Sequence, residues 1–202
     1  NHTTAVVGTN IYFHGGHDGN DWLDDLYIFN TITYSWSKPK VSGNRPSGRA
    51  CHTMSRVGKK LYMFGGYDGE RCFNDMDVLD LDTMTWIQPS VGGQCPMARN
   101  AHTMTVVGTK LFLFGGHSGN KHLKDLHVFD TETLEWSEPN ICGNPPKGLR
   151  GHTASLIGNK LYLFGGYDGR GRSLKKIIPS NDLYVLNTDT MRWSHPSELE
   201  KS

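Results

Sequence analysis

A short apolar run that ends in two glycines recurs along the chain and sets the frame for every other feature. It reads NIYFHGG at 10–16, KLYMFGG at 60–66, KLFLFGG at 110–116 and KLYLFGG at 160–166. The second glycine of each pair falls 50 residues after the one before it, at Gly16, Gly66, Gly116 and Gly166. A fixed period of this length is typical of a repeat architecture, so the chain is predicted to hold four equivalent units.

Each unit carries patterns that predict four strands. A half-polar first strand at 2–7, 52–57, 102–107 and 152–157 is followed by a glycine turn and then by the apolar run. A third strand follows an aspartate, at 25–29, 75–79, 125–129 and 182–186, and a fourth contains Trp36, Trp86, Trp136 or Trp193. The second strand is apolar on both faces, so both faces must be covered.

Four antiparallel strands per unit, repeated with apolar faces, predict an all-β fold of stacked blades, a β-propeller. Pro39, Pro89, Pro139 and Pro196 follow the tryptophans by three residues, and we expect the fourth strand to be an outer edge because proline lacks a ladder donor. The expected blades are 1–43, 44–93, 94–143 and 144–202. The register is interrupted in the fourth unit, where seven extra residues fall in the 170–181 loop.

Composition and charge narrow the class of partner. The 202 residues carry 21 basic and 20 acidic side chains, a net charge of +1, so a nucleic-acid partner is not expected. No apolar run reaches membrane-spanning length, so a membrane partner is not expected either. The sequence begins at Asn1 without an initiator methionine and is interpreted as a fragment or processed product. The unpatterned Cys51, Cys72, Cys95 and Cys142 are interpreted as free thiols in a reducing compartment, which favours an intracellular, cytoplasmic location and leaves the nucleus open.

The repeats resemble those of the kelch family. The features that carry the resemblance are the double glycine, the aromatic-Asp-Gly that follows it, the spaced tryptophan and the Pro-x-x-Arg segments Pro46–Arg49 and Pro96–Arg99. The 50-residue period is more similar to kelch-only and host-cell-factor-like intracellular chains than to the BTB-linked adaptors. The resemblance implies a propeller, commonly of six or seven blades. We therefore expect these four blades to be part of a larger ring, with closure by four blades as the alternative.

Antiparallel geometry places the loops between strands two and three and the segments between strand four and the next strand one on the same rim. We call this rim the loop face. Longer loops on a rigid scaffold are where binding usually resides, and the resemblance implies that partners dock there. The candidate partner-binding residues are those after the double glycine and those entering the next first strand: His17, Tyr67, His117, Tyr167, Arg49, Arg99 and Arg150. Arg150 lies two residues before its histidine, whereas Arg49 and Arg99 lie three before theirs.

Charge on the loop face is uneven. The first unit contributes Asp18, Asp21, Asp24 and Asp25, and the fourth contributes Arg170, Arg172, Lys175 and Lys176. An acidic peptide is expected to prefer the fourth-unit side, because arginine binds carboxylates bidentately. The alternative is that the inserted loop is merely solvated.

A repeated histidine opens each unit, at His2, His52, His102 and His152. A metal site needs converging ligands, and the repeat alone explains the recurrence, so no metal and no cofactor are expected. The sequence predicts a noncatalytic protein-interaction module, a scaffold or a substrate-recruiting platform. The alternatives are a kelch-fold enzyme, either a metal-dependent oxidase or a lyase-like protein, and a cytoskeletal cross-linker.

Overall fold

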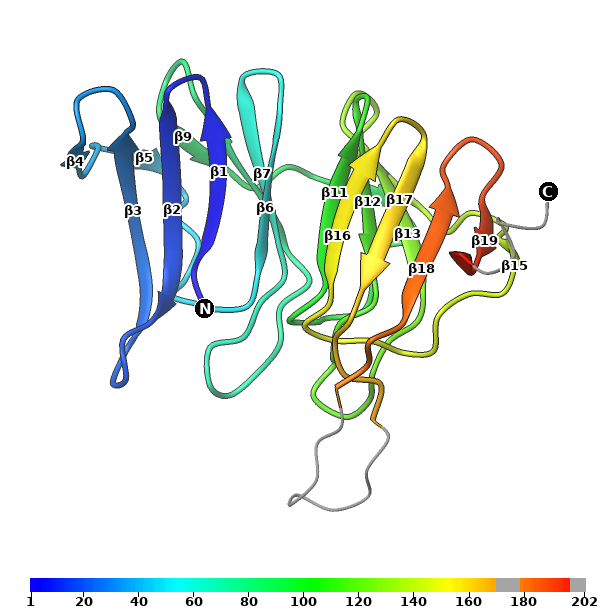
Figure 1. Ribbon diagram of the computed structural model, residues 1–202. Helices are drawn as coiled ribbons and strands as arrows, with labels where there is room; N and C mark the ends of the chain where they lie inside the picture. Colours follow the sequence, from blue (N-terminus) through cyan, green and yellow to red (C-terminus); the bar gives the residue numbers. More distant parts are fainter. Residues whose placement is uncertain (170–178, 197–202) are drawn as a thin grey trace. The chain divides into compact units, whose positions relative to one another are not determined.

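The computed structural model describes residues 1–169 and 179–196, and these residues form one antiparallel sheet for each sequence repeat (Figure 1). The first two sheets contain the strands β1 (Thr3–Val7), β2 (Asn10–His17), β3 (Trp22–Asn30), β4 (Ser35–Ser37), and then β6 (Thr53–Val57), β7 (Lys60–Phe64), β8 (Met76–Asp80), β9 (Thr85–Ile87). The other two contain β11 (Thr103–Val107), β12 (Lys110–Phe114), β13 (Leu126–Asp130), β14 (Glu135–Ser137), and then β16 (Thr153–Ile157), β17 (Lys160–Phe164), β18 (Leu183–Asn187), β19 (Arg192–Ser194). The prediction of four-stranded propeller blades is confirmed.

Three two-residue strands that the pattern did not predict add to the later sheets. They are β5 (Ser42–Gly43), β10 (Gly92–Gly93) and β15 (Cys142–Gly143). Ser42 and Gly43 pair in parallel with Thr85 and Trp86, so the chain leaving the first blade forms the outermost strand of the second. A Cβ on Gly43 would lie 2.1 Å from the Trp86 carbonyl oxygen, which explains the glycine.

The prediction that the fourth strand is the outer edge is therefore wrong for three of the four sheets. In the first sheet β4 is outermost, but β9, β14 and β19 each lie inside a two-residue strand. The physical reason is that the prolines fall after the ladder ends: Pro89 follows β9 by two residues. The backbone of β9 is free to pair with β5.

Two of the four second strands, β7 and β12, have the two buried faces that their composition predicts, whereas β2 and β17 each have one buried and one partly exposed face, and Phe164 in β17 is 53% exposed. In β7, the four residues from Leu61 to Phe64 are all almost fully buried, and so are the four from Leu111 to Phe114 in β12. The turn before β2 is the expected tight hairpin, because Val7 pairs with Asn10 across Gly8, whose φ is +58°.

The double glycine is required both by its backbone angles and by close neighbours. Gly66 has a φ of +108°, and a Cβ there would lie 2.9 Å from the His52 Cβ. A Cβ on Gly115 would lie 2.6 Å from the Leu149 carbonyl oxygen. His52 belongs to the segment that enters the second blade, which contains Gly66, and Leu149 belongs to the segment that enters the blade after that of Gly115. The glycines therefore let the segments that enter blades approach the sheets closely.

The chain divides into two compact units, each of which holds two blades. Unit 1 is Asn1–Gly92 with Met97–Asn100, and unit 2 is Gly93–Pro96 with Ala101–Ser202. Within each unit the first strands of the two sheets are neighbours, β1 with β6 and β11 with β16 (Figure 1). The core of unit 1 is Ala5, Tyr12, Leu26, Met54, Leu61, Met63, Leu79 and Trp86. The core of unit 2 is Phe112, Phe114, Leu126, Val128, Leu149, Leu161, Leu163, Leu186 and Trp193.

The repeated tryptophan is buried in three blades and exposed in the first. Trp86, Trp136 and Trp193 are 1–2% exposed, whereas Trp36 is 59% exposed. Trp36 still packs against Phe13 and Phe29, each with ring centroids 4.9 Å away. The outer face of the first sheet is thus an aromatic surface that faces solvent.

Candidate functional site

The loop face of unit 1 is held together by backbone hydrogen bonds between the two blades. Gly16 donates its N–H to the Arg49 carbonyl oxygen at 2.8 Å, and Arg49 donates its own N–H to Leu23 at 3.1 Å. The next residue, Ala50, forms a bridge with Tyr67 of the second blade. The segment entering the second blade therefore lies between the loops of both blades, as strand direction predicts.

Unit 2 repeats this arrangement and shows which residues are equivalent. Gly116 donates to the Leu149 carbonyl oxygen at 2.7 Å, Leu149 donates to Leu123 at 3.0 Å, and Arg150 bridges Tyr167. Leu149 therefore occupies the place of Arg49, and Arg150 that of Ala50. The grouping of Arg150 with Arg49 and Arg99 is corrected by this register.

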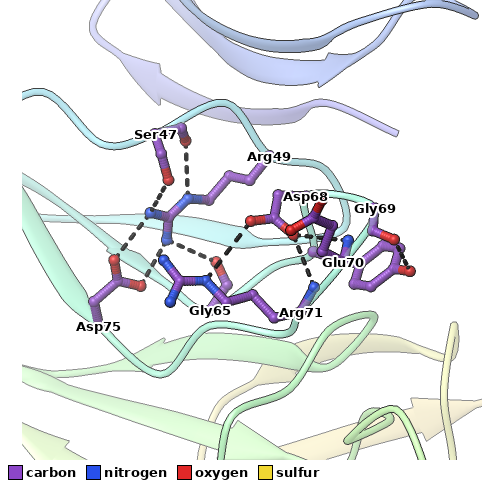
Figure 2. A network of polar contacts seen from close by, with 9 residues as sticks. Ser47, Arg49, Gly65, Asp68, Gly69, Glu70, Arg71 and Asp75 are labelled. Carbon is purple, nitrogen blue, oxygen red and sulfur yellow. Dashed lines mark hydrogen bonds and ion pairs between the residues drawn. The ribbon is translucent and has the colours of Figure 1, made fainter.

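Arg49 lies inside unit 1, where it holds the loop face in place (Figure 2). It is 1% exposed and binds Asp75 bidentately, at 2.6 and 2.9 Å. Its remaining N–H groups donate to the carbonyl oxygens of Ser47 and Gly65 and to the Ser47 hydroxyl. The guanidinium group also stacks over the Phe73 ring at 4.0 Å. All five N–H donors of the Arg49 guanidinium group are engaged within the unit. Arg49 therefore holds the loop face in position from inside the unit.

Arg99 is also buried, at 0% exposed. Its backbone N–H donates to Phe73, its carbonyl oxygen accepts from Gly66, and its Nε donates to Met97 at 2.9 Å. The repeat pattern predicted Arg49 and Arg99 to be surface binding residues. In the structure both side chains lie beneath that surface.

Around Arg49 lies a group of buried ionisable side chains. Asp77 is 2% exposed, and burial together with the Asp75 charge raises its pKa to about 7. Arg49 lies 3.9 Å from Asp77 but is already engaged by Asp75, so it offsets this rise only in part. On the opposite sheet, burial and the charge of Arg49 lower the pKa of His14 to about 4. His14 Nδ1 lies 3.2 Å from His52 Nε2.

The four residues after the double glycine occupy equivalent places over their loops. His17 and His117 each accept the N–H of the loop glycine two residues on, at 3.2 and 3.1 Å, and Tyr67 donates its hydroxyl to Gly69. Tyr167 is 37% exposed and bridges Arg150. The rings of His17, Tyr67 and His117 are thus each fixed by their own loop, whereas Tyr167 is held through its backbone.

A tryptophan that the sequence analysis did not select completes an aromatic row in unit 1. Trp22 packs against His17 with centroids 4.4 Å apart, and meets Tyr67 edge-on at 5.4 Å. Gly69 of the second blade lies against its indole, since a Cβ there would be 2.7 Å from Nε1. A signal was present in the sequence, because the same place in the next blades holds Cys72 and His122.

The corresponding place in unit 2 has imidazoles. His117 and His122 face each other with centroids 5.0 Å apart and at a steep angle. The pKa of both is lowered, by burial first and then by the nearby Arg150 charge. The lowered pKa favours the neutral form of both rings, and Arg150 supplies positive charge to this surface together with the exposed Lys121 and Lys124.

The recurring first-strand histidines have separate environments. His52 lies against His14, whereas His152 lies 2.9 Å from the Thr103 hydroxyl and has a pKa lowered to about 4 by burial. His2 is exposed and packs against Phe13. Among residues 1–169 and 179–196, no group of three or more His, Cys, Asp or Glu side chains could hold a metal ion.

Several sequence expectations concern other parts of the chain. Arg170, Arg172, Lys175 and Lys176 lie outside the described residues. The four cysteines are free thiols, as expected. Within the described part of the chain, no helix is long and apolar enough to cross a membrane.

A polar pocket of about 310 Å³ opens beside Arg49 in unit 1. Its walls include the buried Arg49 and Asp77, the half-buried Asp75, and the exposed Arg45 and Arg71. The walls carry both signs of charge, and the two carboxylates face the already engaged Arg49. The pocket is therefore an extension of the buried ion-pair network.

Blades of this topology, repeated in register, define the chain as a β-propeller repeat protein. It belongs to the kelch-repeat family: the model of the KLHDC2/KLHL20/DRC7 Kelch-repeats domain matches residues 1–201. The kelch fold is commonly used for protein–protein interaction, and the family is generally noncatalytic.

A curated relative matches over a much shorter stretch. It is the Rho GTPase-activating protein gacHH of Dictyostelium discoideum, 40% identical over 52 residues. The match covers 25% of this chain and 3% of that protein. The similarity is about one repeat long.

Proposed function

We propose that the chain is a noncatalytic interaction module that binds a protein or peptide on its loop face. The observation that carries this proposal is the row of partly exposed rings in unit 1, His17, Trp22 and Tyr67, held in place by backbone bridges and by the buried Arg49. Rigid, amphipathic rings suit binding because they offer contact area at a low entropic cost.

Arg49 and Arg99 support this surface and do not contact the partner. Arg49 fixes the segment that hydrogen-bonds to the loops of both blades, so the rings above it are preorganised. Preorganisation reduces the entropic cost of binding. In unit 2, we assign direct contact to His117, Tyr167 and Arg150, and an acidic segment is the partner chemistry that Arg150 favours.

The test compares capture by matched variants. One variant replaces His17 and Tyr67 by alanine, a second replaces Arg150 and Tyr167, and a control replaces Thr9 and Lys59, which lie on the hairpin rim. The proposal predicts that the wild type and the control capture a partner protein that one or both loop-face variants fail to capture. That partner, once purified, should bind the wild type directly. If every directly binding protein were captured equally well by the wild type and by all the variants, the proposal would be contradicted.

Two alternative functions give different results in the same experiment. A cytoskeletal cross-linker would co-sediment with filaments, and a kelch-fold enzyme would turn over a substrate. The structure offers no observation that favours either over binding, so the loop-face proposal is the one we pursue.

A further inference from the structure

The exposed residues beside Trp22 have a charge that the second and third blades lack. Asp21 and Asp24 occupy the places of Arg71 and Asn74 in the second blade, and of Lys121 and Lys124 in the third. Packing does not require an acid at these places, because the corresponding loops of the second and third blades fold around basic and neutral side chains. The change of charge is therefore confined to the surface of the first blade.

The two carboxylates are available to a partner. Asp21 and Asp24 are exposed, and among the described residues neither side chain takes part in a hydrogen bond or an ion pair. Asp18 differs, since its carboxylate accepts the N–H groups of Asn20 and Asp21 at 2.8 Å and so shapes the turn. Asp25 also differs, because it pairs with Lys38.

Nearby charges from the second blade do not cancel this acidity. Glu70 is exposed on the adjacent loop and adds a further negative charge. Arg71 lies 3.8 Å from the Asp68 carboxylate (Figure 2). It also lies over the Phe73 ring at 5.0 Å, so part of its charge is compensated within its own blade. The aromatic row of unit 1 thus lies in an acidic surrounding.

We propose that this surface, formed by His17, Trp22 and Tyr67 with Asp21 and Asp24, binds an arginine- or lysine-bearing segment of the partner protein. A guanidinium or ammonium group is attracted to the faces of indole and phenol rings, and the carboxylates compensate its charge. Rings and carboxylates together select a cation, whereas rings alone would accept any apolar side chain. This inference rests on the proposed function of the loop face and names its partner chemistry in unit 1.

The direct probe is a short fluorescent peptide of alternating arginine and serine, measured by anisotropy. A peptide with citrulline in place of arginine keeps the length and the planar shape of the side chain but replaces the charged guanidinium group by a neutral urea group. A third peptide has glutamate in place of arginine. The chain's net charge of +1 makes nonspecific attraction to the arginine peptide weak.

Two variants use residues that the chain's own repeats carry. Trp22→His introduces the residue of the third blade, and the double variant Asp21→Arg/Asp24→Asn introduces the residues of the second. Asp82→Asn is the control, since it removes an exposed charge in the same unit at the turn beyond β8, where Asp82 pairs with Lys59. Trp22→Phe serves as a second aromatic variant if Trp22→His unfolds the loop, because it keeps a ring with a weaker quadrupole.

The inference predicts binding of the arginine peptide over both other peptides, weakening with salt. Trp22→His is expected to weaken it about twofold to fivefold, which corresponds to one exposed cation–π contact. The double variant is expected to weaken it by at least as much, because it removes two carboxylates and adds a positive charge. Asp82→Asn should leave binding unchanged.

Equal binding of the citrulline peptide, or full binding by both Trp22 and Asp21/Asp24 variants, would overturn the inference. The proposed function fails separately, through the capture experiment. A captured partner that is lost when His17 and Tyr67 are replaced, but kept when Asp21 and Asp24 are replaced, would support binding at the loop face and contradict the cationic segment.

Discussion

Arg49 is the residue on which the geometry of the unit 1 loop face depends. Unit 2 solves the same packing problem without a buried arginine: where unit 1 has His14, Arg49 and Asp77, unit 2 has Phe114, Leu149 and Tyr184. An aspartate is kept, because Asp182 occupies the place of Asp75. Burial of an ion pair contributes little net stability compared with an apolar replacement, but removal of one partner leaves an uncompensated charge. The two units thus provide an internal comparison.

Replacing Arg49 by leucine, the residue of unit 2, is expected to destabilise the chain by about 3–5 kcal/mol, because Asp75 and Asp77 lose their counter-charge. The double variant Arg49→Leu/Asp77→Tyr should recover part of this loss. Urea unfolding monitored by tryptophan fluorescence measures both. Lys59→Ala removes an exposed ion pair and should change stability little. A double variant no more stable than the single one would contradict this account.

The buried titrating groups predict how stability depends on pH. The pKa of Asp77 is raised to about 7, so its favourable contribution is complete below the unfolded pKa of 3.8 and is lost as pH rises toward 7. The pKa of His14 is lowered to about 4, so its contribution is present above 6.5 and is lost as pH falls toward 4. His152 acts in the same direction as His14.

Between pH 4 and pH 7 these groups oppose one another, and single variants should reveal them. Asp77→Asn is expected to make stability rise more steeply with pH than in the wild type. His14→Phe, which introduces the residue found in the other blades, should make the rise shallower. Unfolding free energies at several pH values in this window provide the measurement. Identical slopes for all three proteins would show that neither group titrates as described.

At the scale of elements, the double glycine lies against the segments that enter blades: its first glycine meets the segment of the next blade, and its second meets the segment of its own blade. Gly66→Ala should destabilise by at least about 1–3 kcal/mol, because φ is +108° there and a Cβ would lie 2.9 Å from His52. Gly58→Asn is the matched control: φ is +58°, and nothing lies within 4 Å of a Cβ. Asparagine tolerates that conformation, so the change should stay within about 0.5 kcal/mol. Thermal melts compare the two, and equal losses would argue against close approach as the cause.

The sequence predicted the blade strands well because a fixed period places each apolar run against the same markers. It could not predict β5, β10 and β15, since two-residue strands have no pattern and depend on a partner from the next repeat. The sequence feature that marks these strands is a glycine in each, Gly43, Gly93 or Gly143. Each of these glycines lies against the carbonyl oxygen of a repeat tryptophan.

The candidate site was predicted only in part, for reasons that differ by residue. His17 and Tyr67 follow from register, and both lie on the loop face. Arg49 and Arg99 were expected at the surface because arginine is seldom fully buried without a partner, and the sequence does not show that Asp75 is that partner. Arg150 was grouped by residue type, whereas counting back from His152 gives Leu149. Trp22 was missed because it breaks the repeat pattern.

At the scale of the whole molecule, the outer face of the first sheet remains open to a neighbour. Trp86→Ala should cost about 3–5 kcal/mol because that ring is buried, and Trp36→Ala much less because the ring is 59% exposed. A larger ring, in which a further blade covers Trp36 and Phe13, remains our prediction. In such a ring the two substitutions would lower the free energy of unfolding by similar amounts. Unfolding measurements on this chain and on a longer form that contains it therefore distinguish an exposed Trp36 from one covered by a further blade.

The central claim is that the loop face binds the partner, and amide hydrogen exchange on the complex with a purified partner tests it most directly. The account predicts slowed exchange at residues 17–22 and 67–72 in unit 1 or at 117–122 and 150–151 in unit 2, with the hairpins at 8–9 and 58–59 unchanged. Protection confined to those hairpins, with the loop face exchanging as in the free chain, would contradict it.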